Sequence, residues 1–500
     1  MFNKNRYIGF VVLIFAVLLL TSCDYGSERR QQYFHVDDLI GKRVGVPVAF
    51  GADFVITEMG VHKITRSFFG VDLPILLKSG NIDAYVIERS AAEIMVTEVP
   101  GLVILPEVIG DEFYTIISHR DNPSLGKAVD AALGEIMAAP VFDEMINRWL
   151  YGGLDGVVMP DIPKGTGEAL IVGVFSQYPP FLYFGIGGER MGFEAELIKR
   201  LAYLLNREII YFETEYDSLF TGVDAGIIDI AISVIYDTPA LRERYFTSRT
   251  YYNNELVMVV LGDSVEMPNF IERIINSVNK HLFIDNRYTY ILEGLLNTLI
   301  ITAIAIVGGT LLGALLCALI RGRRKYLRQF ANFYVRMIQG TPVIILLMLC
   351  IYVIFAGLKI NSVVLSGIAF SFYFAANICE VLRACLDAID KGQIEAAKAI
   401  GLNKRQVYKL VLIPQLLVLS LPIYCANLVE MIKLTAVVGY VGVMDLTYSV
   451  EVIRSRTYES IFPLLLEMVI YILITTVVAG FFRLILKKID PMQKSRRIRI

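Results

Sequence analysis

Cysteine is scarce in this 500-residue chain, and its placement excludes two kinds of site. Of six cysteines, Cys23 lies near the N-terminus and the others begin at Cys317. The stretch between them therefore has no disulfide framework and no cysteine zinc site. The four histidines are scattered without the spacing of metal ligands, so we interpret them as ordinary surface or packed residues. A GxxxxGK[ST] phosphate loop is also lacking, so any ATP must be bound by another chain.

Charge is low as well, and it is unevenly distributed. The formal net charge of −2 gives no sign of a nucleic-acid partner, since such domains usually carry a basic stripe. With 55% hydrophobic and 19% charged residues and a mean hydropathy of +0.56, the chain is too apolar for one soluble globule. Charges fall every few residues from Val36 to about Phe283, whereas long uncharged runs follow Gly294. The sequence predicts a soluble α/β part followed by a membrane part.

The N-terminus has the features of an export signal. Lys4 and Arg6 precede the apolar run Tyr7–Leu20, and small residues follow. The closing sequence LTSC resembles the lipobox of bacterial lipoproteins, which implies that Cys23 is lipidated and that residues 1–23 are the signal. An uncleaved signal anchor is the alternative. Both interpretations place the following residues outside the cytoplasm.

We expect five transmembrane helices, because a helix needs about 20 apolar residues to cross the hydrocarbon core. The candidate spans are roughly 292–320, 337–358, 362–386, 411–433 and 461–485.

Basic residues, which mark cytoplasmic loops, fix the expected direction of these spans. They cluster at Arg321–Arg328, at Lys391–Lys409 and in the tail from Lys487. The clusters share one side only if the first span runs from outside to inside. This places the soluble part outside, in agreement with the export signal.

A charged, alanine-rich stretch at 391–414 interrupts the apolar runs. Alanine favours helix and has little bulk, so another protein can approach such a helix closely. Gly401 offers a helix end with positive φ, and Asn403 can cap a second short helix. The stretch resembles the EAA loop of ABC importer permeases, which couples to the ATPase subunit. The resemblance implies this coupling role for Gly392, Glu395, Ala396, Ala397 and Gly401.

Two further segments extend this resemblance to the polar amino-acid importers. Arg336–Pro342 is similar to their RGTP signature, with Gln339 where an arginine usually stands. Asn427–Thr435 is similar to their late KDTS segment, with Leu434 and Ala436 replacing two polar residues. The resemblance implies an all-α membrane domain of the type I ABC importer permease fold.

Several segments of the exported part carry a second resemblance. Val172–Phe181 and Gly192–Leu201 are similar to the opening strand, turn and helix of periplasmic amino-acid-binding proteins. The half that should follow lies upstream, where Val36–Val46 and Leu77–Glu88 are similar to the second lobe. We infer a circular permutation of a two-lobed α/β domain; two decayed tandem domains are the alternative. The order also suggests that the 36–110 lobe is held at the membrane while the 116–252 lobe moves.

These resemblances divide the multidomain chain. We expect lobes at 35–110 and at 111–262 (with a connection at 151–168), a linker at 263–286 and the permease domain at 287–490, with its loop at 391–414.

The resemblance also implies a ligand site between the lobes. In the family an arginine binds the ligand's carboxylate in a bidentate pair, an acidic residue binds its ammonium, and aromatic faces enclose its side chain. Carried over by position, the ligand-binding residues are Tyr178, Tyr216, Ser233, Thr238, Arg242 and Glu88, with Arg242 on the carboxylate, Glu88 on the ammonium and the two tyrosines as walls.

This sequence departs from the family pattern around that site. The spacing from Thr238 to Arg242 is one residue longer than the family's, which makes Arg244 a rival. Tyr236 and Ala49-Phe50 stand where the family has polar residues. Either an unusual amino acid or another kind of solute is therefore compatible with the sequence.

We accordingly expect the binding and permease subunit of an ATP-driven importer for a polar amino acid or related solute, in the bacterial inner membrane. It needs no catalytic site, metal or cofactor of its own, and its partners are a separate ATPase and a second permease chain. The alternative is a ligand-gated ion channel, because glutamate-receptor channels also join such a domain to membrane spans. Val438–Gly442 is similar to a carbonyl-lined potassium filter. A membrane sensor is a third interpretation, but no output domain is recognisable.

Overall fold

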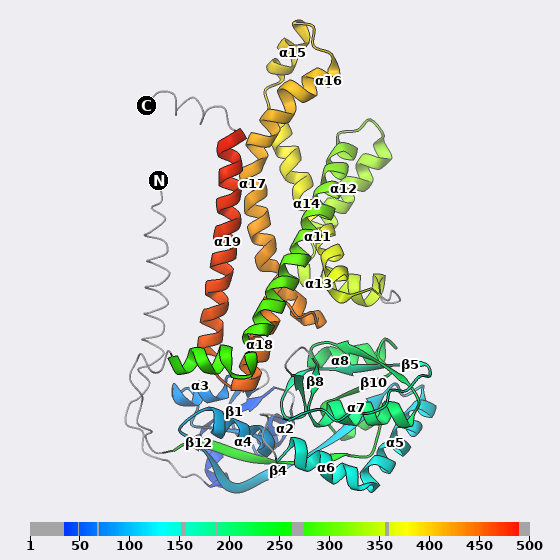
Figure 1. Cartoon of the computed structure of the whole chain (residues 1–500), viewed down its shortest axis with the longest axis vertical. Helices are drawn as coiled ribbons and strands as arrows, with labels where there is room; N and C mark the ends of the chain where they lie inside the picture. The colour runs from blue at the N-terminus through cyan, green and yellow to red at the C-terminus, as the bar shows by residue number, and fades with distance from the viewer. Residues whose placement is uncertain are drawn as a thin grey trace. The chain divides into compact units, whose positions relative to one another are not determined.

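The computed structural model in Figure 1 describes residues 35–48, 50–67, 70–151, 157–185, 189–262, 275–355 and 360–489. The chain forms two compact units. The first unit comprises residues up to Leu292 together with Ser449–Leu466, and the second comprises Glu293–Tyr448 and the residues from Glu467 onward. The predicted signal and its Cys23 lie outside the described residues.

The first unit is built on a nine-stranded sheet with the order β2-β1-β3-β12-β4-β10-β5-β9, in which β11 also pairs with β4. The strands are β1 (Arg43–Pro47), β2 (Lys63–Ser67), β3 (Ala84–Glu88), β4 (Leu102–Ser118), β5 (Ala169–Val174), β9 (Glu208–Glu213), β10 (Ile230–Tyr236), β11 (Phe246–Thr247) and β12 (Tyr252–Leu261). Pairing is parallel among β2, β1 and β3 and again among β10, β5 and β9. The long antiparallel strands β12 and β4 join these two parallel groups. A small sheet of β6 (Gln177–Tyr178), β7 (Leu182–Phe184) and β8 (Arg190–Met191) completes the strands of the described residues.

Helices cover this sheet. They are α2 (Gly51–Glu58), α3 (Leu73–Lys78), α4 (Arg89–Glu98), α5 (Pro123–Ala138), α6 (Pro140–Trp149), α7 (Phe193–Leu204), α8 (Tyr216–Asp224) and α9 (Pro239–Arg244). Strand β3 explains why the first parallel group is buried on both faces. Its side chains alternate, so Ala84 and Val86 lie in one apolar cluster and Tyr85 and Ile87 in another. A third cluster collects apolar residues from 114–252 and one residue from the other end of the sheet, Phe50.

A segment from far along the chain belongs to the first unit. Within Ser449–Leu466, Tyr458 is buried in the cluster that contains Tyr85. Arg454 Nη2 and Ser460 Oγ each donate to Asp72 Oδ1 at 2.7 Å. Residues 35–262 are therefore not the whole of the first unit.

The second unit is helical. Its elements and those at the boundary are η3 (Asn279–Phe283), η4 (Ile284–Asn286), α11 (Tyr288–Ile320), α12 (Lys325–Gln339), α13 (Val343–Leu349), η5 (Cys350–Ile354), α14 (Ser362–Asp387), α15 (Lys391–Ala399), α16 (Lys404–Val407), η6 (Tyr408–Leu412), α17 (Ile413–Leu434), η7 (Thr435–Val441), α18 (Leu446–Thr457) and α19 (Ile461–Ile489). Small residues let α11 and α14 approach closely. A Cβ at Gly309 would lie 2.7 Å from Phe374 Cβ, and one at Gly313 would lie 2.7 Å from the Ala375 carbonyl oxygen.

The predicted number of spans is confirmed only in part. In the described residues, four helical stretches are long and apolar enough to cross a membrane, namely 288–320, 362–387, 404–441 and 461–489. The span expected at 337–358 is instead a pair of helices, α12 and the run Val343–Ile354, bent by 111°. Pro342 separates them, because it lacks an N–H and disfavours helical backbone at Thr341. The five spans of the sequence prediction are reached only if this bent pair counts as one.

Candidate functional sites

Two buried carboxyl groups lie at the centre of the first unit. Glu88 ends β3 and precedes α4, and Glu112 lies on β4. Both side chains are fully buried, at 0% exposure. In the described part of the chain, neither carboxyl has a basic side chain within the 4.0 Å of an ion pair. An unpaired buried charge is costly, so these groups need protons, hydrogen bonds or a cation from elsewhere.

Hydrogen bonds satisfy three of the four carboxyl oxygens. Tyr178 Oη donates to Glu88 Oε2 at 2.6 Å. Tyr114 Oη donates to Glu112 Oε2 at 3.0 Å, and the Gly51 N–H donates to Glu112 Oε1. Glu88 Oε1 is buried, and its one candidate donor among the described residues is the carboxyl of Glu112, which must hold a proton to donate.

Burial dominates the protonation of this pair. Desolvation raises the pKa of Glu88, although the hydrogen bonds from Glu112 and Tyr178 oppose the rise. Desolvation raises the pKa of Glu112 further, to well above its usual range, and repulsion by Glu88 adds to it. Both carboxyls therefore hold a proton more tightly than they would in water.

Three aromatic rings form a stack beside the carboxyls. The ring of Phe50 stacks against both Tyr178 and Tyr216, with centroid distances of 5.2 and 5.1 Å and interplanar angles of 20° and 21°. All three side chains are buried. We call Phe50, Glu88, Glu112, Tyr178 and Tyr216 the acidic–aromatic cluster.

The structure brings together one half of the predicted ligand site. Glu88, Tyr178 and Tyr216 meet in the acidic–aromatic cluster. Ser233 is buried on β10 and accepts a hydrogen bond from the Phe175 N–H at 2.9 Å.

The predicted carboxylate clamp does not join them. Thr238 caps α9 by accepting from the Leu241 N–H. Arg242, 62% exposed, is held by Asp237, whose oxygens accept from its guanidinium. Arg244, the rival, is likewise exposed and pairs with Asp224. Each arginine thus has a local carboxylate partner on the surface.

Sequence reasoning missed two members of the cluster. No alternation of residue types marks Glu112, since on β4 the acidic Glu112 is buried while its apolar neighbour Phe113 is exposed. Phe50 was noted only as a departure from the family pattern. Its role depends on contacts with residues far away in sequence, so no local signal marks it. Ala49 beside it lies outside the described residues.

The second candidate site is the α15–α16 hairpin, residues 391–407 of the helical unit. Asp390 caps α15 by accepting from the Gly392 N–H at 2.8 Å. The predicted turn is confirmed, because Gly401 has a φ of +88° and Asn403 forms a capping box with Gln406. Figure 1 shows the hairpin at one end of α14 and α17.

The hairpin has its own small core and an exposed outer face. Ala397 and Val407 pack with Ile389 and Leu412. Ala397 is therefore a packing residue, whereas Gly392, Glu395, Ala396 and Gly401 are exposed. Ile400 is 78% exposed at the tip of the hairpin.

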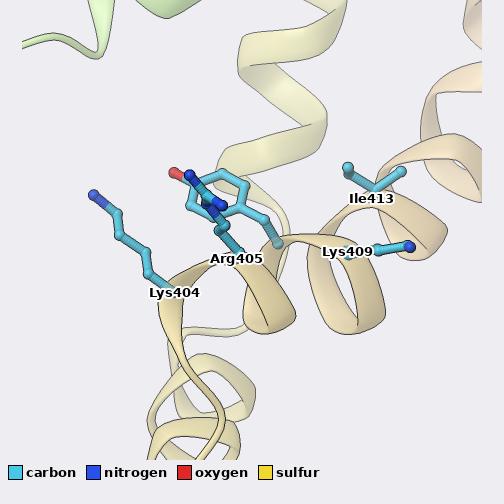
Figure 2. A pocket seen from close by; sticks show the side chains of 5 residues that line it. Lys404, Arg405, Lys409 and Ile413 are labelled. Carbon is cyan, nitrogen blue, oxygen red and sulfur yellow. The ribbon is translucent and has the colours of Figure 1, made fainter.

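A shallow hollow lies on the helix that continues from this hairpin. Figure 2 shows Lys404, Arg405, Lys409 and Ile413 around it. Tyr408 also lines it. The hollow therefore has an apolar floor with three cationic side chains, a surface suited to a partner with acidic and apolar groups.

Comparison with known proteins assigns the helical unit. The model of the family "binding-protein-dependent transport system inner membrane component" matches residues 305–491. The putative glutamine transport system permease protein GlnP of Rickettsia conorii is 33% identical over 201 residues, which is 40% of this chain and 92% of that protein. The chain belongs to this family of transport permeases.

Other similar proteins include further amino-acid permeases. The arginine transport system permease protein ArtQ of Bacillus subtilis is 29% identical over 202 residues, covering 40% of this chain and 92% of that protein. A solved structure described as an amino acid ABC transporter with histidines is 25% identical, with a TM-score of 0.39, and covers 45% of this chain and all of that chain. The family match begins at residue 305, so the sheet of the first unit lies outside it. None of these similarities supports the ion-channel alternative.

Membership has consequences for partners. An ABC permease is not itself an enzyme; it works with an ATPase and a partner permease on a small solute, in a membrane that its apolar helices cross.

Proposed function

We propose that this chain is the substrate-binding and membrane-permease subunit of an ATP-driven importer for a polar amino acid or a related small solute. One observation carries this proposal. One part of the chain matches 92% of a putative glutamine permease, and the same chain also contains an α/β unit. The first unit captures the solute outside the bacterial inner membrane, and the helical unit conducts it inward.

We assign the contact with the separate ATPase to the α15–α16 hairpin. Its two capped helices and its own core make it a stiff element, so a displacement at Glu395 is passed to α14 and α17 rather than absorbed. The exposed Ile400 and the cationic hollow offer the partner apolar and charged contacts. ATP-driven closure of the partner would then tilt the pathway inward.

We further propose that the first unit is a two-lobed, circularly permuted binding-protein domain, with lobes at 35–110 and 111–262. Its single sheet, with β4 and β12 shared by both parallel groups, favours one composite domain over two tandem ones. Helix α6 ends at Trp149 and β5 begins at Ala169, so the connection at 151–168 joins the two halves in the reversed order. Permutation is tolerated where the natural ends lie close together at a surface.

The 35–110 lobe is proposed as the fixed one. The segment Ser449–Leu466, which leads into α19, buries Tyr458 in that lobe's core and bonds to its Asp72. The 116–252 lobe is then free to open and close over the acidic–aromatic cluster.

Transport measurements with the full chain test this function. Cells would produce the tagged chain, and the ATPase that copurifies with it would be identified and coexpressed. We expect Glu395→Arg to abolish both copurification and uptake, while Glu144→Arg, an exposed change in α6, leaves both intact. Currents without ATP, or undiminished uptake by Glu395→Arg, would argue for the channel alternative instead.

A further inference from the structure

We propose that the acidic–aromatic cluster binds an organic cation that carries no carboxylate group, such as a protonated amine or guanidine, rather than an amino-acid zwitterion. This inference deepens the proposed function, on which it rests, by naming the chemical class of the solute. In this proposal Glu88 and Glu112 bind the cationic group, and Tyr178 and Tyr216 contact the hydrocarbon part of the ligand.

The first argument is the imbalance of charge. The two buried carboxyls lie together, and the described residues supply no base within ion-pairing distance of either. The arginines that a carboxylate would need are tied to Asp237 and Asp224 on the surface. A zwitterion's carboxylate would therefore lie beside Glu88 and Glu112 without a compensating charge, and like charges brought together at a binding site cost several kcal/mol.

The second argument is the unsatisfied oxygen. Three carboxyl oxygens already accept hydrogen bonds from Tyr178, Tyr114 and the Gly51 N–H. Glu88 Oε1, buried with the rest of its side chain, has no donor among the described residues other than the carboxyl of Glu112, which must hold a proton to donate. An unpaired buried acceptor is unfavourable, and a charged N–H donor would satisfy it with the strongest kind of hydrogen bond.

The third argument is the aromatic stack. The Phe50 ring stacks against Tyr178 and against Tyr216, at centroid distances of 5.2 and 5.1 Å, so a flat or extended group in its place would contact both tyrosines. Aromatic faces attract cations, most strongly where water is excluded. Phe50 fills this place in the present conformation, so we infer that it is a stand-in which a ligand displaces when the domain opens.

Matched pairs of ligands test the inference directly. Binding to the full chain in lipid nanodiscs would be measured by calorimetry for four amines and the amino acids from which they differ by one carboxylate. The pairs are agmatine and L-arginine, 4-aminobutanamide and L-glutamine, histamine and L-histidine, and tyramine and L-tyrosine. We expect at least one amine to bind about 100-fold more tightly than its amino acid, the ratio that follows from a repulsion of several kcal/mol.

Variants identify the groups responsible. Glu88→Gln and Glu112→Gln keep the shape and remove one acid each, so each should weaken the best amine at least about tenfold. Glu144→Gln in α6 is the matched exposed control. Phe50→Leu removes the aromatic ring that we infer the ligand displaces, so it should tighten binding. Leucine keeps much of the apolar volume and is used in case Phe50→Ala does not fold.

The possible results separate this inference from the importer itself. Equal or tighter binding of any amino acid than of its amine overturns the cation inference, while ATP-dependent uptake of that amino acid would leave the importer intact. Failure of every amine to bind both the wild type and Phe50→Leu overturns it too. Selective binding of an amine that the chain does not transport with ATP would support the inference and count against the importer.

Discussion

The acidic–aromatic cluster and the α15–α16 hairpin are assembled from the sequence in different ways. The cluster takes its five side chains from five segments: the turn before α2, the strands β3, β4 and β6, and the helix α8. The hairpin is one continuous segment whose caps are supplied by residues within three positions of the bonds they make. Every cluster side chain is buried, whereas most hairpin side chains are exposed.

This difference indicates which unfolding process each region affects. The cluster exists only when the whole first unit is folded, so changes in it act on global unfolding of that unit. The hairpin is determined locally, so changes in it act on local opening. The only tryptophan of the chain, Trp149, makes the comparison measurable. It is buried in the first unit, where its Nε1 donates to Glu196, and its fluorescence reports unfolding of that unit alone.

The largest effect is expected at Phe50. Replacing it with alanine removes a buried ring stacked against two tyrosines, which typically costs about 3–5 kcal/mol. Urea unfolding of the full chain, followed through Trp149, should show this loss. Phe54→Ala in α2 is the matched control, because Phe54 is 51% exposed. If both variants lose equally little stability, the stacked ring of Phe50 does not contribute to the stability of the first unit.

The contrast also explains which parts of the two regions could be predicted from the sequence alone. The hairpin was predicted down to its positive-φ glycine and its capping asparagine, because both depend on neighbours within a few residues. In the cluster, Glu88, Tyr178 and Tyr216 were predicted only through resemblance to a family. Phe50 lies in the place expected for a ligand, and Arg242 pairs with a neighbouring aspartate instead of reaching the site. The positions of Phe50 and Arg242 depend on tertiary contacts, which the pattern of residue types does not predict.

The membrane part illustrates the same limit. Long apolar helices were predicted within a few residues at α11, α14 and α19. The span expected around Pro342 is a bent pair of helices, because composition alone does not reveal a bend of 111°. The seven residues of α13 and the five of η5 reach about 18 Å at ~1.5 Å per residue, short of the roughly 30 Å hydrocarbon core.

A second effect should come from Glu194, a buried acid of α7. Its carboxyl accepts from the Val234 N–H and the Tyr251 hydroxyl, yet burial raises its pKa to about 7. Because the folded state holds this proton more tightly than the unfolded chain, the stabilisation is complete below the unfolded pKa of about 4.3 and is lost as pH rises through 7. The free energy of unfolding read through Trp149 should fall by about 3 kcal/mol over that range. Other buried acids of this unit also have a raised pKa, so Glu194→Gln should make the profile less steep rather than flat; an equally steep profile in that variant would assign the proton to another group.

The smallest effect, and the one confined to the hairpin, is expected at Gly401. A Cβ there meets no atom within 4 Å, so Gly401→Ala is opposed only by the backbone, whose φ of +88° costs a non-glycine residue about 1–2 kcal/mol. Hydrogen exchange should become about tenfold faster at the amides around Gly401, since 1.4 kcal/mol is a factor of ten, while the urea midpoint read at Trp149 stays unchanged. Gly392→Ala is the control, because Gly392 lies in the first turn of α15 without a positive φ. A shift of the Trp149 midpoint by Gly401→Ala would show that the hairpin and the first unit unfold together, and the separation between the two regions would then be mistaken.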